Sequence, residues 1–213
     1  MAPTFFLEVI GTIAFAFSGA FVAIECKLDI FGILCAAVVT ATGGGMTRDI
    51  ILGNTPPMMF RDPTYVIIAI LFAFATVLIY VPLVKSRFKK NILGIINVLD
   101  AIGLAVFTIV GMNNAVQFGY GDNCFLVCFV GVLSAVGGGL IRDIFVDRKP
   151  VILQKEIYAT ASLVGSVFYY YGSRVLPGYL SPTISRVLIF LIRFGSLHRD
   201  ITLPLAEKPP AGK

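Results

Sequence analysis

One seven-residue string occurs twice in this 213-residue chain, and it holds the residues with the clearest potential for chemistry. It reads GGGMTRD over residues 43–49 and GGGLIRD over residues 137–143. Three consecutive glycines weaken a helix by roughly 3 kcal/mol, because each costs about 1 kcal/mol relative to alanine. Close packing needs small residues on only one helix face. We therefore expect a break or kink in a helix at each triplet.

A helix broken inside a membrane would present backbone groups that can bind ions. The half-helix ending before each triplet would present unpaired carbonyl groups, which suit a dehydrated cation. The half-helix beginning after it would present amide groups, which suit the carboxylate of an amino acid. The residues alone therefore leave two substrate classes open, monovalent cations and small amino acids. The predicted pathway residues are Gly43, Gly44, Gly45, Gly137, Gly138 and Gly139.

Six ionisable residues fall inside predicted apolar segments, where an unpaired charge costs several kcal/mol. They are Glu8, Arg48, Asp49, Asp100, Arg142 and Asp143. Adjacent helical side chains point about 100° apart, so we expect neither arginine to pair well with the aspartate that follows it. Depth along the helices instead predicts Arg48 near Glu8, and Arg142 near Asp100 in the second half. The alternative is that these charges only lock helices together.

The composition places these residues in a membrane protein, because 57% of the side chains are apolar and 14% are charged. The mean hydropathy is +0.90, far outside the range of soluble domains. A helix needs about 20 apolar residues to span the hydrocarbon layer. The sequence therefore predicts an all-α polytopic membrane protein with seven transmembrane helices. The predicted spans are 4–25, 30–53, 63–84, 92–112, 122–146, 153–173 and 181–197.

The basic residues predict the orientation, since Lys and Arg are retained in cytoplasmic loops. With the N-terminus outside, twelve basic residues fall on the cytoplasmic side and only Arg61 and Arg174 outside. The twelve are Lys27, Lys85, Arg87, Lys89, Lys90, Arg148, Lys149, Lys155, Arg193, Arg199, Lys208 and Lys213. We therefore expect the N-terminus outside and the C-terminus in the cytoplasm. This topology accounts for the net charge of +5, which gives no reason to expect nucleic-acid binding.

The similarity between the two halves extends beyond the glycines. Residues downstream of the triplets match at an offset of 94, and residues upstream match at 92, as Glu8 matches Asp100 and Phe15 matches Phe107. Each unit has three spans, and because this number is odd the second copy enters the membrane from the opposite face. The sequence therefore predicts a 3+3 inverted repeat with the site at the interface between the two copies. We expect repeats over 1–90 and 91–175, and a seventh helix with a polar tail over 176–213.

No residue pattern indicates an enzyme or a bound cofactor. Cys26, Cys35, Cys124 and Cys128 fit neither a metal site nor a disulfide framework, and His198 is the only histidine. We expect no catalytic residues, no cofactor and no metal beyond a transient monovalent cation at the glycine triplets.

Several strings together resemble the prokaryotic branch of the trimeric intracellular cation channel (TRIC) family, which is also labelled a bacterial glycine transporter family. Besides the two triplets they are GNTPP at 53–57, FRDP at 60–63, KLDIFG at 27–32 and EIYA at 156–159. The resemblance covers about residues 5–195. It implies a homotrimer in which each protomer has its own pore along the glycine-rich second and fifth helices. It also implies a location in a bacterial inner membrane.

The resemblance also implies conduction of potassium and other monovalent cations. Animal members bear a lipid-binding Lys-Glu-x-Arg element, of which this chain has only Lys155 and Glu156. A potassium channel is therefore our first hypothesis for function, with membrane lipids as the surrounding partners. A secondary transporter of glycine or another small amino acid is the alternative.

Overall fold

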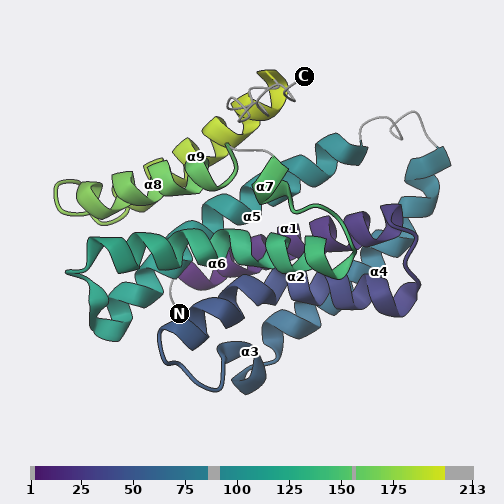
Figure 1. Cartoon of the computed structure of the whole chain (residues 1–213), viewed down its shortest axis with the longest axis horizontal. Coiled ribbons are helices and arrows are strands. Elements are labelled where there is room, and N and C mark those ends of the chain that lie inside the picture. The colour runs from purple at the N-terminus through teal and green to yellow at the C-terminus, as the bar shows by residue number, and fades with distance from the viewer. Residues whose placement is uncertain (1–2, 86–91, 155–156, 200–213) are drawn as a thin grey trace, which may run out of the picture.

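The structure is a computed structural model that describes residues 3–85, 92–154 and 157–199, and this part of the chain is all-helical (Figure 1). Seven helices occupy the seven predicted spans. They are α1 (Pro3–Glu25), α2 (Ile30–Ile51), α4 (Thr64–Lys85), α5 (Ile92–Ala115), α6 (Cys124–Phe145), α8 (Ala159–Gly172) and α9 (Leu180–Arg199). The short helices α3 (Met58–Arg61) and α7 (Val151–Gln154) follow the triplet helices α2 and α6. Lys155 and Glu156 lie outside the described residues.

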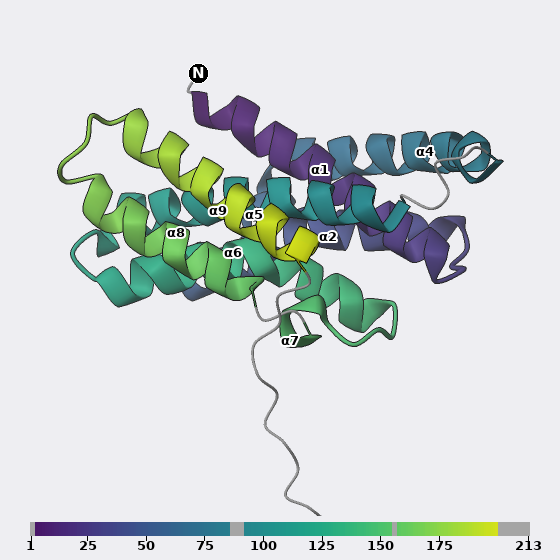
Figure 2. The same ribbon diagram turned by 90° about the horizontal axis from the view of Figure 1, so that it is seen from above.

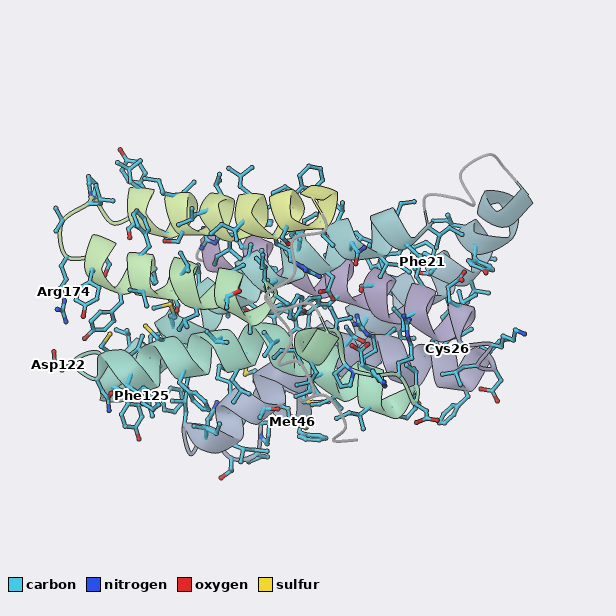
Figure 3. The ribbon with its side chains drawn as sticks, turned by 45° about the horizontal axis from the view of Figure 1, so that its top comes forward. Phe21, Cys26, Met46, Asp122, Phe125 and Arg174 are labelled. Carbon is cyan, nitrogen blue, oxygen red and sulfur yellow. The ribbon has the colours of Figure 1, made fainter. Side chains whose placement is uncertain are left out.

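Five of the described helices are long and apolar enough to cross a membrane, namely α1, α2, α5, α6 and α9. The helix α4 has 22 residues and α8 has 14. Loops that the predicted topology assigns to the same side share an end of the bundle. Asp122 and Arg174 lie at one end and Cys26 at the other, as Figure 3 shows.

The helices form two similar halves. In the first half α4 packs against α1 and α2, and in the second α8 packs against α5 and α6. The helix α9, which has no counterpart in the first half, covers α5 and α8 (Figures 1 and 2). The centre is therefore made by α1, α2, α5 and α6.

The two halves meet in opposite directions. A Cβ at Gly138 would meet the carbonyl oxygen of Thr40, while a Cβ at Gly44 would meet that of Ser134. As α2 advances from residue 40 to 44, its α6 partner thus retreats from residue 138 to 134, so the helices are antiparallel. This is the geometry that an inverted repeat requires.

Equivalent residues of the two halves also make equivalent local contacts. Each triplet helix begins at a capping side chain, Asp29 in α2 and Asn123 in α6, whose oxygens accept hydrogen bonds from backbone N–H groups three residues later at 2.7 Å and 3.0 Å. Beyond the helix ends, Gly53 has a φ of 74° and Asp147, 94 residues later, a φ of 54°. The same turn therefore follows both triplet helices, with aspartate in place of glycine in the second.

Arg61 and Asp62 lie just before α4, which begins at Thr64. A carboxylate oxygen of Asp62 accepts hydrogen bonds from the backbone N–H of Thr64 at 3.0 Å and from its hydroxyl at 2.6 Å. These bonds favour the ionised carboxylate and lower the pKa of Asp62. Asp62 therefore acts at a helix end, outside the centre of the bundle.

The structure shows no break in the helices at the triplets. Both α2 and α6 are continuous through residues 43–45 and 137–139. Backbone groups there are paired as in any helix interior, and the Gly43 carbonyl also accepts the Thr47 hydroxyl at 2.8 Å. Glycine has a low helix propensity. The glycines also permit a close contact between α2 and α6, and this contact offsets the cost. The triplets therefore present neither free carbonyls nor free amides.

Candidate functional site

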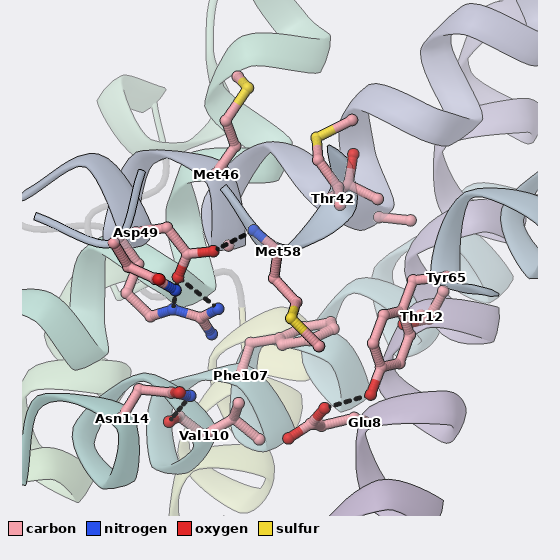
Figure 4. Close-up of a pocket in the computed structure, with 15 residues that line it drawn as sticks. Glu8, Thr12, Thr42, Met46, Asp49, Met58, Tyr65, Phe107, Val110 and Asn114 are labelled. Carbon is pink, nitrogen blue, oxygen red and sulfur yellow. Dashed lines mark hydrogen bonds and ion pairs between the residues drawn. The ribbon is translucent and has the colours of Figure 1, made fainter. Parts of the chain in front are cut away.

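A cavity of about 220 Å³ lies between α1, α2, α4 and α5, beside the end of the first triplet (Figure 4). Its polar lining consists mainly of carboxylate, guanidinium, hydroxyl and amide groups. These belong to Glu8, Thr12, Thr42, Arg48, Asp49, Asn54, Tyr65 and Asn114. Gly45, Phe107 and Val110 form part of the remaining wall. We call this space the Arg48 cavity.

The charges in the Arg48 cavity are held by hydrogen bonds from three elements. The carboxylate of Glu8 on α1 accepts a hydrogen bond from the Tyr65 hydroxyl on α4. Arg48 donates through Nε to Oδ1 of Asp49 at 2.8 Å, and its Nη2 lies 2.8 Å from the same oxygen. The other carboxylate oxygen of Asp49 accepts from the backbone N–H of Met58 at 2.8 Å, which ties α3 to α2.

The prediction that Arg48 would pair poorly with Asp49 is wrong, because the long arginine side chain folds back toward its neighbour. Arg48 and Glu8 share the cavity wall, but Asp49 is the ion-pair partner of Arg48 among the described residues. The expected pairing of Arg48 with Glu8 is thus replaced by Arg48–Asp49 and Glu8–Tyr65 contacts.

The second arginine forms a denser cluster at the opposite end of the central helices. Arg142 pairs with Asp143 at 2.8 Å, so the expectation that it would pair poorly with the following aspartate is also wrong. It lies 3.2 Å from Asp100, which confirms the predicted proximity of these two residues. Its Nη1 also donates to the Ser18 hydroxyl at 3.0 Å. Asp143 accepts from the backbone N–H of Val151 at 2.9 Å, repeating the tie from Asp49 to Met58. We call this group the Arg142 cluster.

The two sites differ in burial although they arise from equivalent residues. Arg142, Asp143 and Asp100 are each at most 5% exposed, and the Arg142 guanidinium contacts two carboxylates and a hydroxyl. Arg48 is also buried, yet its guanidinium borders an open cavity and has one carboxylate partner. The Arg48 end is therefore the half that can admit a small molecule or ion in this conformation.

The six predicted glycines have three different surroundings. Gly45 alone among them lines the Arg48 cavity. Gly44 and Gly138 lie in the α2–α6 contact, where a Cβ on either would approach a carbonyl oxygen of the other helix to 2.0 Å, and Gly43 and Gly137 border the same contact. A Cβ at Gly139 would lie 3.6 Å from Nη2 of Arg142, so Gly139 borders the Arg142 cluster.

Tyr65 and Tyr158 were not among the predicted site residues, because their neighbours come from helices far away in the chain. Tyr65 binds Glu8 across 57 positions, and Tyr158 is buried beside Gly139. The predicted topology places Arg193 in a cytoplasmic segment. In the structure it lies in α9 and its side chain is buried, with 1% of the residue exposed. Its charge within an apolar span was the signal that could have marked it.

Fold and sites together define a polytopic helical membrane protein built from two antiparallel halves, with charged residues and a cavity at its centre. A family model described as "Glycine transporter" matches residues 5–81 and 97–174. The chain therefore belongs to this family, as its resemblance to TRIC proteins predicted. The two matched segments correspond to the two halves described above.

Similar proteins occur in distant bacteria. The chain is 38% identical to the inner membrane protein YadS of Escherichia coli K12 over 205 residues, which is 94% of each protein. It is 40% identical to the membrane protein YvgT of Bacillus subtilis strain 168 over 161 residues, or 76% of each.

Solved structures of TRIC cation channels have the same fold. One, described under "Structural basis for conductance through TRIC cation channels", is 33% identical with a TM-score of 0.84 and covers 99% of this chain and 100% of its own. The TRIC orthologue from Rhodobacter sphaeroides is 31% identical with a TM-score of 0.83 and covers 94% and 100%. The seven-helix fold is thus that of the TRIC channels.

Proposed function

We propose that this protein is a monovalent cation channel, most readily for potassium, whose path in each protomer runs along α2 and α6 through the Arg48 cavity. The observation that carries the proposal is the charge of this cavity. Arg48 and Asp49 neutralise each other, which leaves the carboxylate of Glu8 as the net charge on its wall. A site of this sign concentrates cations and repels anions. The likeness to solved cation channels supports the same function.

The continuous helices change how an ion would be coordinated. Free carbonyls at the triplets are not present, so a cation in the cavity would contact Glu8, the hydroxyls of Thr12 and Thr42, and the Asn114 side chain. One carboxylate with neutral oxygens gives weak binding, which conduction needs because an ion must also leave. Gly45 keeps the α2 wall of this path free of side-chain bulk.

Transport of glycine is the second candidate, and one contact favours it. Asp49 engages Nε and Nη2 of Arg48, which itself lines the cavity, so among the described residues Nη1 is the guanidinium nitrogen left to bind a carboxylate. The description of the family model points the same way. Glu8 could then bind the amino group of the same molecule.

Single-channel recording of the purified protein in planar bilayers distinguishes these candidates. We expect discrete currents that reverse near the potassium equilibrium potential. Glu8→Gln should lower the unitary conductance roughly threefold or more, because the cavity loses its net negative charge. Saturable glycine uptake without unitary currents, abolished by Arg48→Gln, would instead establish the carrier.

Glu25→Gln is the matched control for the effect of Glu8. Glu25 lies on the same helix and also accepts a hydrogen bond from a tyrosine of α4, Tyr80, at 2.9 Å. It is exposed and does not line the cavity. Equal losses of conductance in both variants would contradict a specific role for Glu8.

The assembly and location that we propose follow from the same relatives. A TRIC orthologue is described as trimeric, and YadS as an inner membrane protein. We propose a homotrimer in a bacterial inner membrane, with the Arg48 cavity toward the outside and the C-terminus in the cytoplasm. Contact with anionic lipids would involve the basic residues of the cytoplasmic loops.

A further inference from the structure

The two ends of the predicted path differ in a way that the repeat does not explain. At the Arg48 end, the residues around Glu8 leave an open cavity. At the other end, the equivalent Asp100 is 5% exposed and lies among buried side chains. A Cβ at Gly139 would be 3.2 Å from the Tyr158 hydroxyl and 3.8 Å from Oδ1 of Asp100, so these groups converge where the second triplet ends.

The side chain of Arg193 is buried at this closed end, and it belongs to α9, which is part of neither repeat. Arg193 of α9 is 1% exposed, and its Cζ lies 4.8 Å from the centre of the Tyr158 ring. Its Nε and Nη2 are buried and have no hydrogen-bond partner among the described residues. Burying charged donors without hydrogen bonds is costly. An arginine with a purely structural role would be expected to have these donors satisfied.

The ring of Tyr158 connects this guanidinium to the path. The Arg193 guanidinium lies over one face of the ring in a cation–π contact, and the Tyr158 hydroxyl lies toward Gly139 and Asp100. The Tyr158 hydroxyl is itself buried without a hydrogen-bond partner among the described residues. Packing and one aromatic face thus hold Arg193 in place, and such contacts can be exchanged more readily than the ion pairs that Arg142 makes with two carboxylates.

We infer that Arg193 is a tethered cation that closes the Arg142 end of the path, by occupying the region where a permeating cation would pass Asp100. This inference rests on the proposed channel function. A fixed positive charge in a space of low dielectric constant repels a second cation strongly. Opening requires α9 to withdraw Arg193 from Tyr158, which removes this positive charge from the region beside Asp100. The first half contains no equivalent of α9, which explains why the Arg48 end is open.

Potassium flux into liposomes that contain the purified protein tests this gate. We expect Arg193→Gln to raise the flux roughly tenfold, since it removes the charge that favours the closed state. Arg193→Lys keeps the charge and should retain low flux. Arg186→Gln is the matched control, because Arg186 is on the same helix and also has a buried Nε without a partner among the described residues, but it lies two turns away. It should leave the flux unchanged.

Three outcomes would overturn the gate. The first is a conducting wild type with no increase in Arg193→Gln, and the second is an equal increase in Arg193→Lys, which would indicate loosened packing rather than loss of charge. If Arg193→Gln does not fold, Tyr158→Leu removes the aromatic face and should raise the flux in its place, and unchanged flux there is the third. Glycine uptake without cation flux in any variant would refute the channel itself, which is a separate result.

Discussion

Gly138→Ala is expected to lower the thermal unfolding midpoint of the detergent-purified protein by roughly 10 °C, or to prevent its accumulation, because overpacking a core costs about 1–3 kcal/mol and sometimes more. The new methyl group would lie 2.0 Å from the carbonyl oxygen of Thr40. A backbone carbonyl cannot rotate away as a side chain can, so α2 and α6 would have to separate. Thermal unfolding followed by intrinsic fluorescence measures the effect.

The equivalent change Gly44→Ala should have a similar effect, because its Cβ would lie 2.0 Å from the carbonyl oxygen of Ser134. Gly94→Ala is the control within α5, where a Cβ would have no neighbour within 4 Å. Alanine favours a helix by about 1 kcal/mol over glycine, so this variant should be as stable as the wild type or slightly more stable. A Gly138→Ala protein with wild-type stability would show that the helices do not cross this closely.

Arg142→Gln is expected to destabilise the protein by about 3–5 kcal/mol, the usual cost of leaving a buried ion pair without one partner. Its loss would leave both Asp100 and Asp143 buried without the cation that they share. Arg48→Gln should cost less, because only Asp49 loses a partner and the adjacent cavity can hold water. Denaturant or thermal unfolding of the two variants in the same detergent gives the comparison.

Neutralising the aspartates tests whether charge causes this loss. Adding Asp100→Asn and Asp143→Asn to Arg142→Gln removes the uncompensated charges and should recover part of the stability. If the triple variant is no more stable than Arg142→Gln, the arginine acts through packing alone. Equal losses in Arg48→Gln and Arg142→Gln would contradict the difference between the two ends.

The charged residues show where reasoning from the sequence succeeded and failed. Counting depth along the helices predicted the pairing of Arg142 with Asp100, because both residues lie on the inner side of the midplane in the predicted topology. The same count predicted that Arg48 would pair with Glu8. These two residues line one cavity but do not form an ion pair. The difference arises because the Arg48 side chain folds back toward Asp49, and because the Glu8 carboxylate accepts a hydrogen bond from the Tyr65 hydroxyl.

The sequence by itself determined the seven helical segments and the presence of two similar halves. Apolar length and the repeat can be read along the chain, and a membrane requires helices to satisfy their own backbone groups. Only the tertiary structure decided that the glycine triplets remain helical, that one end is open and that Arg193 lies at the other. These features depend on how each helix is rotated and how closely it approaches its neighbours, and contacts between distant residues set both.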